Sequence, residues 1–240
     1  MNTVKRAVIM AAGEGRRMLP VTLHTPKPLV RVNGVRMIDS VIKALQQNKI
    51  HEIYIVVGYL KEQFAVLEQE YPEITLIENP DYKSCNNISS LYAAREHLEE
   101  AMILDGDQLI FEPAVLHREF ERSGYNCIWT SEPTKEWLLS LRSGIVCGCS
   151  RNGGREGWQL YSVSRWTKQD GKKLKKYLEQ EFVVNGNKQL YWDDVALFCH
   201  PEEFQLGITE MKRGDIVEID DLEELAAIDC TYQKYLKEVE

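Results

Sequence analysis

The 240-residue sequence lacks the marks of several common classes of protein. No apolar run approaches the roughly 18 residues that a membrane span requires, and the N-terminal segment has no signal-peptide pattern. Basic residues are in the minority, because 29 Lys and Arg stand against 37 Asp and Glu, for a net charge of −8. A nucleic-acid-binding protein usually carries a basic patch. We therefore expect a cytoplasmic protein that neither inserts into membranes nor binds nucleic acid.

The cysteine pattern argues against a structural zinc site. The six cysteines are scattered, and Cys147-x-Cys149 has neither metal-knuckle spacing nor a second pair of ligands. We expect reduced thiols, as in most cytosolic proteins. Hydrophobic residues make up 44% of the chain, which is enough for a sizeable core, and the length suits one α/β domain.

Two familiar phosphate-binding motifs are also missing. The P-loop string Gly-x-x-x-x-Gly-Lys-Ser/Thr does not occur, and the dinucleotide fingerprint fails because Met18 follows Gly13-x-Gly15-x-x where a third glycine is required. These absences argue against a P-loop NTPase and against a nicotinamide-dependent dehydrogenase.

Residues 7 to 28 nevertheless predict a polyphosphate site. The apolar run 7–10 predicts a buried strand. Gly13 and Gly15 follow it, where they can adopt positive φ and leave room for a ligand, and successive N–H groups of such a turn can bind an anion. Lys27 lies between two prolines that bias the backbone there toward an extended form. The cations of this segment are Arg16, Arg17 and Lys27.

The string Ala-Ala-Gly-x-Gly-x-Arg-Met-x-Pro-x-Thr, followed by Thr-Pro-Lys-Pro-Leu, resembles the signature of the nucleotidyltransferases that make nucleotide-activated sugars and alcohols. The resemblance implies that the glycine loop binds the triphosphate of an NTP, and that Arg17 and Lys27 are catalytic. Arg16 stands where this family often has Thr or Ser. The loop residues implied to bind the nucleotide are Ala11, Ala12, Gly13, Glu14, Gly15, Arg16 and Arg17.

The first half of the chain alternates strands and helices. Predicted strands at 7–10, 53–57, 74–77 and 102–104 are separated by predicted helices at 37–45, 61–71 and about 88–99. This alternation predicts a Rossmann-like α/β fold, a mostly parallel sheet flanked by helices and joined by right-handed crossovers. Ligands of such sheets bind at the carboxyl ends of the strands, so we expect Gly58 and Tyr59 to join the glycine loop in the nucleotide site.

The second half predicts a small antiparallel insertion on the acceptor side. Short strands are expected at 125–130, 138–142, 145–149, 158–163 and 217–220, and helices at 113–123, 168–184, from Asp194 to Pro201, and at 222–236 after an Asp221 cap. We expect one domain over residues 1–240, with a nucleotide-binding half at about 1–110 and an acceptor-binding half at about 111–240.

Polar residues gather at the start of the predicted helix near residue 88. Asn87, Ser89 and Ser90 either cap that helix or contact the nucleobase. The string Asn-Asn-x-x-Ser-Leu-Tyr replaces the Gly-Thr-Ala typical of the sugar enzymes and resembles the branch of the family that contains bacterial phosphocholine cytidylyltransferases. That resemblance implies a cytidine nucleotide.

Asp105-Gly106-Asp107 follows the fourth strand of the predicted sheet. Such a string is often a simple turn, but Mg²⁺ on phosphates prefers one or two carboxylates. The family resemblance implies Mg²⁺ as cofactor, held by Asp107 and Asp220. Asp105 either supports this nucleotide site or caps the turn.

Two aromatic strings, Glu136-Trp137 and Tyr191-Trp192-Asp193, permit two interpretations. The tryptophans are either core residues or walls of an aromatic cage, which binds quaternary ammonium groups. Both strings resemble segments of the phosphocholine cytidylyltransferases. The acceptor-binding residues implied by this resemblance are Trp137, Tyr191, Trp192 and Asp193.

The resemblance as a whole implies an enzyme that transfers CMP from CTP to phosphocholine, by in-line attack at the α-phosphate with loss of pyrophosphate. The alternatives are 2-aminoethylphosphonate, phosphoethanolamine or a sugar 1-phosphate as acceptor, or a regulatory subunit without catalytic activity. The sequence does not fix the oligomeric state, and it is compatible with a homodimer.

Overall fold

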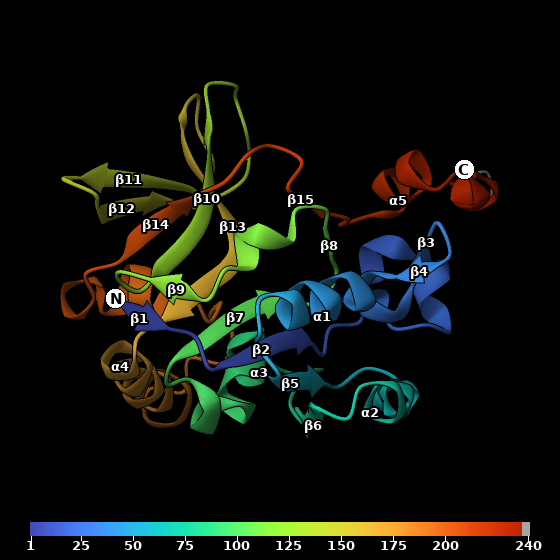
Figure 1. Ribbon diagram of the computed structural model, residues 1–240, viewed down its shortest axis with the longest axis horizontal. Coiled ribbons are helices and arrows are strands. Elements are labelled where there is room, and N and C mark those ends of the chain that lie inside the picture. The colour runs from blue at the N-terminus through green and yellow to red at the C-terminus, as the bar shows by residue number, and fades with distance from the viewer. Residues whose placement is uncertain (237–240) are drawn as a thin grey trace.

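The computed structural model describes residues 1–236; the last four residues of the expected domain, 237–240, lie outside the described part. Its centre is a parallel four-stranded core in the order β7 (Ala101–Asp105), β2 (Arg6–Ala11), β5 (Glu52–Val57), β6 (Ile74–Glu78). Helices cover both faces of these strands (Figure 1). The expectation of a mostly parallel α/β sheet flanked by helices is confirmed.

Alternate residues of β2 pack on opposite faces of the sheet, as the twofold repeat of a strand requires. Ala7 and Ile9 belong to a core cluster with α1 (Met37–Gln47) and α2 (Ala65–Glu70). Val8 and Met10 belong to a second cluster with α3 (Ile88–Ala93) and α4 (Lys168–Glu179). Both faces of a parallel sheet are buried in this way, which is why its strands are continuous apolar runs.

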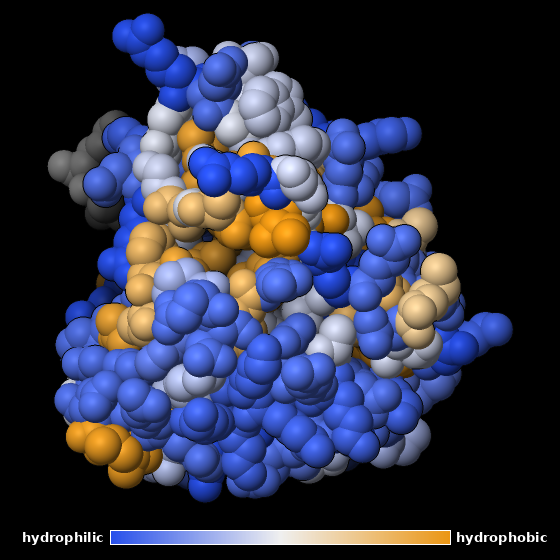
Figure 2. Space-filling view, turned by 90° about the vertical axis from the view of Figure 1, so that its left-hand side faces the viewer, coloured by the Kyte–Doolittle hydropathy of each residue, from blue (hydrophilic) through white to orange (hydrophobic). Residues whose placement is uncertain are grey.

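The second half of the chain extends the same sheet with antiparallel strands. β13 (Gly157–Trp166) pairs with β7 and also with β10 (Gly124–Thr130) and β11 (Leu138–Arg142). β11 pairs in turn with β12 (Ile145–Ser150). β14 (Gly207–Glu210) adds a parallel partner to β10. Figure 2, which faces this side of the molecule, shows apolar side chains around a hollow. A groove of about 570 Å³ lies there, lined by residues of β12 and of segment 196–206.

Three two-stranded ribbons complete the strands that the structure describes. β1 (Asn2–Thr3) pairs with β9 (Glu119–Phe120), β3 (Arg31–Val32) with β4 (Val35–Arg36), and β8 (Gln108–Ile110) with β15 (Ile216–Glu218). The last ribbon directs the chain after β15 toward the ends of β2 and β7.

A third apolar cluster attaches the C-terminal segment to the loop that follows β2. It joins Met18, Val30 and Val32 to Ile219, Leu222 and Leu225. The last two belong to α5 (Leu222–Ile228), whose N-cap is Asp221, as predicted: its side chain accepts a hydrogen bond from the Glu224 amide at 2.9 Å.

Several predicted helices differ from the structure. Segment 113–123 is not an α-helix. It contains only a 3₁₀ turn, Pro113–Leu116, followed by strand β9, from which Phe120 enters the core. Segment 61–71 begins as a 3₁₀ turn, and segment 168–184 ends in a π-helical turn, Gln180–Val184. The closing helix breaks after Ile228, because the Asp229 side chain caps a new turn and α6 (Gln233–Leu236) follows. The expected helix from Asp194 is a π-helical turn, Val195–Cys199.

Candidate active site

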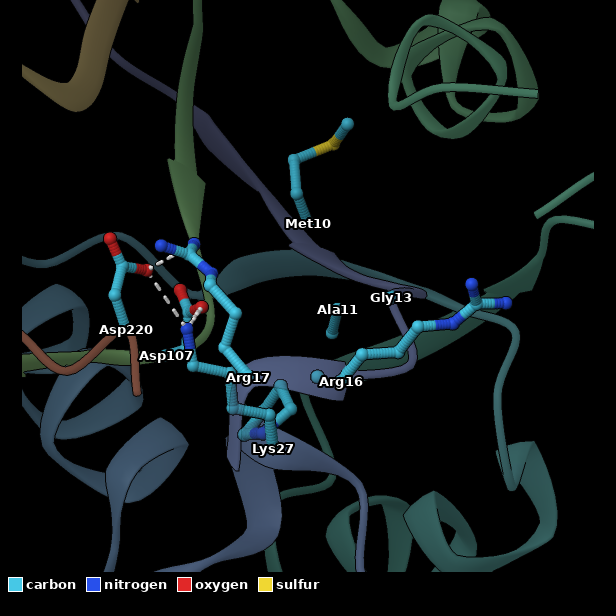
Figure 3. A pocket seen from close by; sticks show the side chains of 10 residues that line it. Met10, Ala11, Gly13, Arg16, Arg17, Lys27, Asp107 and Asp220 are labelled. Atoms are coloured by element: carbon cyan, nitrogen blue, oxygen red, sulfur yellow. Dashed lines mark hydrogen bonds and ion pairs between the residues drawn. The ribbon is translucent and has the colours of Figure 1, made fainter. Parts of the chain in front are cut away.

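A cavity of about 300 Å³ opens at the carboxyl end of β2. It is lined by residues from the loop after β2, the end of β7 and the segment after β15 (Figure 3). Of the predicted site residues, the cavity brings together Ala11, Gly13, Gly15, Arg16, Arg17, Lys27, Asp107 and Asp220.

Gly15 is the glycine on which the loop depends. Its φ is +62°, and a Cβ there would lie 3.0 Å from both the Lys27 Cβ and the Thr22 Cγ2. The Thr22 hydroxyl donates a hydrogen bond to the Gly15 carbonyl at 2.8 Å and fixes this turn. Gly13, in contrast, does not adopt positive φ, but a Cβ on it would meet nothing within 4 Å, so its bare backbone leaves the cavity open.

Lys27 begins a 3₁₀ turn rather than lying in the extended backbone that its flanking prolines predict. The Leu29 amide donates to the Pro26 carbonyl at 2.8 Å, and proline is well tolerated in the first turn of a helix. The turn packs the stem of Lys27 against Gly15, so that the side chain is only 9% exposed and its amine is directed at a defined point.

That point is a pair of carboxylates. The Lys27 Nζ lies 2.5 Å from Asp107 Oδ2 and 3.2 Å from Asp220 Oδ1, and the Arg17 Nη2 lies 3.0 Å from the same Asp220 oxygen (Figure 3). Burial favours a neutral amine, but the two carboxylates outweigh it and raise the pKa of Lys27 above its ordinary value. Two cations and two anions therefore balance at the centre of the site.

Arg16 points away from this group in Figure 3. Its Nε lies 2.5 Å from the Glu14 carboxylate, and its side chain is exposed. The two neighbouring arginines thus reach opposite sides of the cavity, which lets them contact different parts of an elongated anion.

The carboxylate pair fits Mg²⁺. Residues 1–236 contain no cluster of three or more Asp, Glu, His and Cys side chains that could hold a metal by themselves. Mg²⁺ in phosphate sites needs only one or two carboxylates, because phosphate oxygens and water complete its octahedron. Asp107 and Asp220, which converge on a single cationic atom, supply that number.

A second cavity, of about 220 Å³, adjoins the first and shares Asp107 and Asp220 with it. None of its lining residues is Lys or Arg. Its other walls are formed by Asn87, Asp105, Glu136, Trp137, Leu160, Ser162, Tyr191, Asp193 and Glu218. Six of the eleven lining residues are therefore acids, a composition that favours a cationic group over an anionic one.

Among residues 1–236, two polar atoms near this cavity are buried with no hydrogen-bond partner in range: Asp193 Oδ1 and the hydroxyl of its neighbour Tyr125. Burial raises the pKa of Asp193 to about 7 and that of Tyr125 well above its ordinary value. Buried polar groups normally find partners, and an unsatisfied one costs about 1–3 kcal/mol. Of the two residues only Asp193 lines the cavity, so a ligand that donates hydrogen bonds would reach its carboxylate, which lies beside the Tyr125 hydroxyl.

Two further carboxyl groups, those of Asp105 and Glu218, line the second cavity. Burial raises the pKa of Glu218 to about 7 and that of Asp105 well above its ordinary value. Gln108 donates a hydrogen bond to Glu218 at 2.8 Å. Asp105 thus lines the second cavity and not the first, and its expected part in the nucleotide site stays a prediction.

Trp137 and Tyr191 form the aromatic wall of the second cavity. Their rings pack edge to face with centroids 5.6 Å apart and an interplanar angle of 82°. Trp192, which was expected beside them, is instead a core residue: it is 3% exposed and its ring lies 6.2 Å from those of both Tyr125 and Trp166. The Trp192 amide donates to the Asn87 side chain at 2.8 Å, which turns the indole into the core.

Ser89 and Ser90 lie outside both cavities. The Asn79 side chain donates to the two hydroxyls at 2.9 and 3.0 Å, and all three residues are buried. These bonds tie α3 to the end of β6. The serines therefore tie the helix to the sheet beside the site, and Asn87 does not cap α3 with its side chain. The base contact of these residues stays a prediction.

Gly58, Tyr59 and Ala12 also support the loop without lining the cavity. A Cβ on Gly58 would lie 2.8 Å from the Tyr82 ring and 2.9 Å from the Ala12 carbonyl. The Tyr59 hydroxyl donates to the Thr22 carbonyl at 2.9 Å, and its amide donates to Ala12 at 3.1 Å. These contacts brace the glycine loop from behind.

The prediction missed several lining residues: Met10, Pro28, Glu136, Leu160, Ser162 and Glu218. Strand periodicity could have found some of them. Leu160 and Ser162 are two residues apart on a predicted strand, so they share a face, and the same spacing relates Glu218 to Asp220.

Comparison with known proteins supports these assignments of fold and class. The model of the MobA-like NTP transferase domain matches residues 7–164. The chain is 39% identical to 2-aminoethylphosphonate cytidylyltransferase of Lancefieldella rimae, over 96% of this chain and 94% of that protein. It is 31% identical to choline-phosphate cytidylyltransferase of Streptococcus pneumoniae, over 91% and 94%. The structure of CTP:phosphocholine cytidylyltransferase from Streptococcus pneumoniae superposes with a TM-score of 0.86 at 30% identity, covering 99% of this chain and all of that one.

Proposed function

Because this chain belongs to the family of MobA-like NTP transferase domains, we propose that it is a cytidylyltransferase whose acceptor is a small phosphonate or phosphate with a primary ammonium group. We favour 2-aminoethylphosphonate. The relatives named above, which are cytidylyltransferases for small amino or choline compounds, support the reaction class. The acid-lined second cavity supports the choice of acceptor.

The observation that carries this choice is the unpartnered Asp193 Oδ1, on a residue that lines the second cavity beside the buried Tyr125 hydroxyl. A primary ammonium has three N–H donors, so it can donate a hydrogen bond to the Asp193 carboxylate. A trimethylammonium group has no N–H and would leave Asp193 Oδ1 without a hydrogen bond. The burial of Trp192 also removes one wall from the aromatic cage that phosphocholine would favour.

In the proposed reaction the two cavities would hold the reactants on either side of the carboxylate pair. CTP would occupy the first cavity, with its triphosphate on the glycine loop, and the acceptor would occupy the second. An oxygen of the acceptor phosphonate then attacks the α-phosphorus; a new P–O bond forms, the bond to the β-phosphate oxygen breaks, and pyrophosphate leaves. The acceptor oxygen is already ionised, so catalysis requires positioning and charge neutralisation rather than a strong base.

The residues of the site have distinct roles in this reaction. Lys27, at the junction of the cavities, would contact the α-phosphate and the attacking phosphonate. Arg17 and the N–H groups of the glycine loop would hold the departing pyrophosphate. Asp107 and Asp220 would hold Mg²⁺, which offsets phosphate charge and orients the triphosphate when bound.

Phosphocholine is the second candidate acceptor. The edge-to-face pair of Trp137 and Tyr191 offers aromatic surface to a quaternary ammonium. A sugar 1-phosphate is disfavoured, since it would bring no cation to a cavity lined by six acids.

The test is pyrophosphate release with Mg²⁺, pairing CTP, UTP, ATP or dTTP with 2-aminoethylphosphonate, phosphoethanolamine, phosphocholine or glucose 1-phosphate. We expect turnover with CTP and the highest kcat/KM for 2-aminoethylphosphonate. A preference for phosphocholine would overturn the choice of acceptor and keep the reaction. Turnover only with the sugar phosphate, or none with CTP, would overturn the proposal.

A further inference from the structure

Arg151 lies behind the aromatic wall of the second cavity and lines neither cavity. It follows β12, in the connection to β13. Its guanidinium makes an ion pair with Asp194, with 2.5 Å between Arg151 Nη2 and Asp194 Oδ1. The same group lies 3.9 Å from the Phe198 ring centroid and 5.5 Å from that of Trp137.

The ion pair reaches the wall through the backbone of Tyr191. Asp194 Oδ1 accepts from Arg151, and Asp194 Oδ2 accepts from the Tyr191 amide at 3.0 Å. The Asp194 side chain is only 2% exposed. A buried carboxylate that loses its cation is strongly destabilised, so the orientation of Asp194, and with it the position of Tyr191, depends on Arg151.

The guanidinium also reaches the wall through aromatic contacts. Trp137 packs edge to face with Tyr191 on one side and with Phe198, at 5.8 Å and 87°, on another. A planar guanidinium can stack on an aromatic ring and pair with a carboxylate at the same time, whereas an ammonium is a point charge. One side chain therefore joins the connection after β12 to the start of β11 and to segment 191–198.

We propose that Arg151 is a positioning residue for the acceptor. It fixes Trp137 and Tyr191 from outside the cavity, through Asp194 and through the stacked rings, and so sets the width of the acceptor cavity. This inference rests on the proposed function, because it takes the second cavity as the acceptor site. The role is specific to the acceptor, since the ion pair and ring contacts that the described residues make with Arg151 come from Asp194, Trp137 and Phe198 and none comes from the glycine loop.

The test compares Arg151→Ala and Arg151→Lys with Arg155→Ala, a matched control at an exposed arginine in the same connection. We expect the KM for the acceptor to rise about tenfold in Arg151→Ala, the size expected for loss of one charge-assisted hydrogen bond. The kcat and the KM for CTP should change less than about twofold, because the variant loses a contribution to acceptor binding that is the same in the ground state and in the transition state. Arg151→Lys keeps the ion pair but not the stacking, so its acceptor KM should fall between those of the wild type and Arg151→Ala.

Tryptophan fluorescence gives a readout besides turnover. The emission of the free enzyme should change in Arg151→Ala, and the acceptor titration should shift to higher concentration, while Arg155→Ala follows the wild type. An unchanged acceptor KM in either Arg151 variant, or an equal rise in the KM for CTP, would overturn the inference. A wild-type protein that turns over 2-aminoethylphosphonate while Arg151→Ala has no effect would refute the role of Arg151 alone. A wild-type protein inactive with every acceptor would refute the proposed function, and this inference with it.

Discussion

The side chains of Lys27 and Asp220 meet in the site although 193 residues separate them, with Nζ 3.2 Å from Oδ1. The apolar cluster that joins Met18 to Ile219 brings the two segments together. Asp107 approaches the same ammonium from the end of β7. In the free protein the amine thus pairs with both carboxylates, and in the proposed reaction the cations would exchange those carboxylates for the phosphates of CTP.

Replacement of Lys27 by Met should remove most of the turnover and leave the fold intact. The ammonium lines the first cavity and contacts Asp107 and Asp220, the two residues that both cavities share, and loss of one such charge-stabilising group costs about 10²- to 10³-fold in kcat. Pyrophosphate release measures the effect, and circular dichroism checks the fold. Lys43→Met, at an exposed position of α1, is the control and should be fully active. Turnover like that of the wild type in Lys27→Met would be incompatible with the mechanism.

Asp107→Asn and Asp220→Asn should raise the Mg²⁺ concentration needed for half-maximal turnover. Loss of a residue that only hydrogen-bonds a metal ligand lowers metal affinity roughly tenfold or more. Loss of a ligand itself should lower the affinity for Mg²⁺ at least as much. Mg²⁺ titrations of turnover, and calorimetry of Mg²⁺ binding in the presence of CTP without acceptor, test this. Glu223→Gln, at an exposed position in α5, serves as the control. If both aspartate variants bind Mg²⁺ as the wild type does, the carboxylate pair is not the metal site.

Local signals in the sequence predicted the features that depend on neighbouring residues. The four parallel strands, the glycine loop and the cap at Asp221 each follow from a short string, and the family that residues 7–28 indicate is confirmed by the comparisons. The acceptor remains a prediction, because relatives that act on different acceptors match at comparable levels.

What could not be predicted depends on distant contacts. Composition does not show which way a side chain points, so Trp192 and Ser89 were expected in the site and are in the core. Strand β14 was missed because its place depends on Gly124, where a Cβ would lie 2.0 Å from the Gly207 carbonyl oxygen. That close approach joins segments more than eighty residues apart, and no local pattern encodes it.

Gly15→Ala should lower both stability and CTP binding. Left-handed backbone costs an L-residue about 1–2 kcal/mol, and the new methyl group would press on the Lys27 stem at 3.0 Å. Gly34→Ala separates the two effects, because Gly34 also has positive φ (+85°) but a Cβ there meets nothing within 4 Å. Thermal unfolding should show a loss for both variants, whereas kcat/KM for CTP should fall only in Gly15→Ala. An equal fall in both would mean that strain, and not contact with Lys27, governs the loop.

Asp193 should give the acceptor reaction a pH dependence near neutrality. Burial raises its pKa to about 7, and its neighbours Tyr125 and Cys149 stay protonated there, since the pKa of Tyr125 is well above its ordinary value and that of Cys149 is about 12. Its other neighbour, Asp194, is paired with Arg151. The carboxylate that binds the ammonium therefore forms as the pH rises through about 7, and kcat/KM for the acceptor should rise with it. The acceptor ionises over the same pH range in both proteins. The ratio of kcat/KM for the wild type to kcat/KM for Asp193→Asn at each pH therefore separates the ionisation of Asp193 from that of the acceptor.

Ionisation of Asp193 should lower the stability of the protein over the pH range in which it raises activity. A folded-state pKa above the ordinary value of 3.8 means that the protonated form is favoured by folding. The contribution of Asp193 to the free energy of unfolding is thus complete below about pH 4 and is lost as the pH rises through about 7. Asp193→Asn should become more stable relative to the wild type over that interval, as thermal unfolding would record. A constant difference from pH 4 to 8 would mean that the carboxyl group is not held protonated in the free protein.

Trp137→Ala should distinguish the two candidate acceptors. A quaternary ammonium depends on the aromatic face, which contributes roughly 0.5–2 kcal/mol, whereas a primary ammonium depends on directional bonds to Asp193, whose carboxylate lies beside the Tyr125 hydroxyl. Loss of the ring should therefore reduce kcat/KM for phosphocholine about tenfold or more and reduce that for 2-aminoethylphosphonate less. Tyr125→Phe is the reciprocal variant, because it removes a hydrogen-bonding atom and keeps the ring, so it should harm only the primary amine. If Trp137→Ala lowers both activities equally and Tyr125→Phe lowers neither, the ammonium group is not bound between this wall and Asp193, and the orientation of the acceptor in the second cavity would have to be reversed.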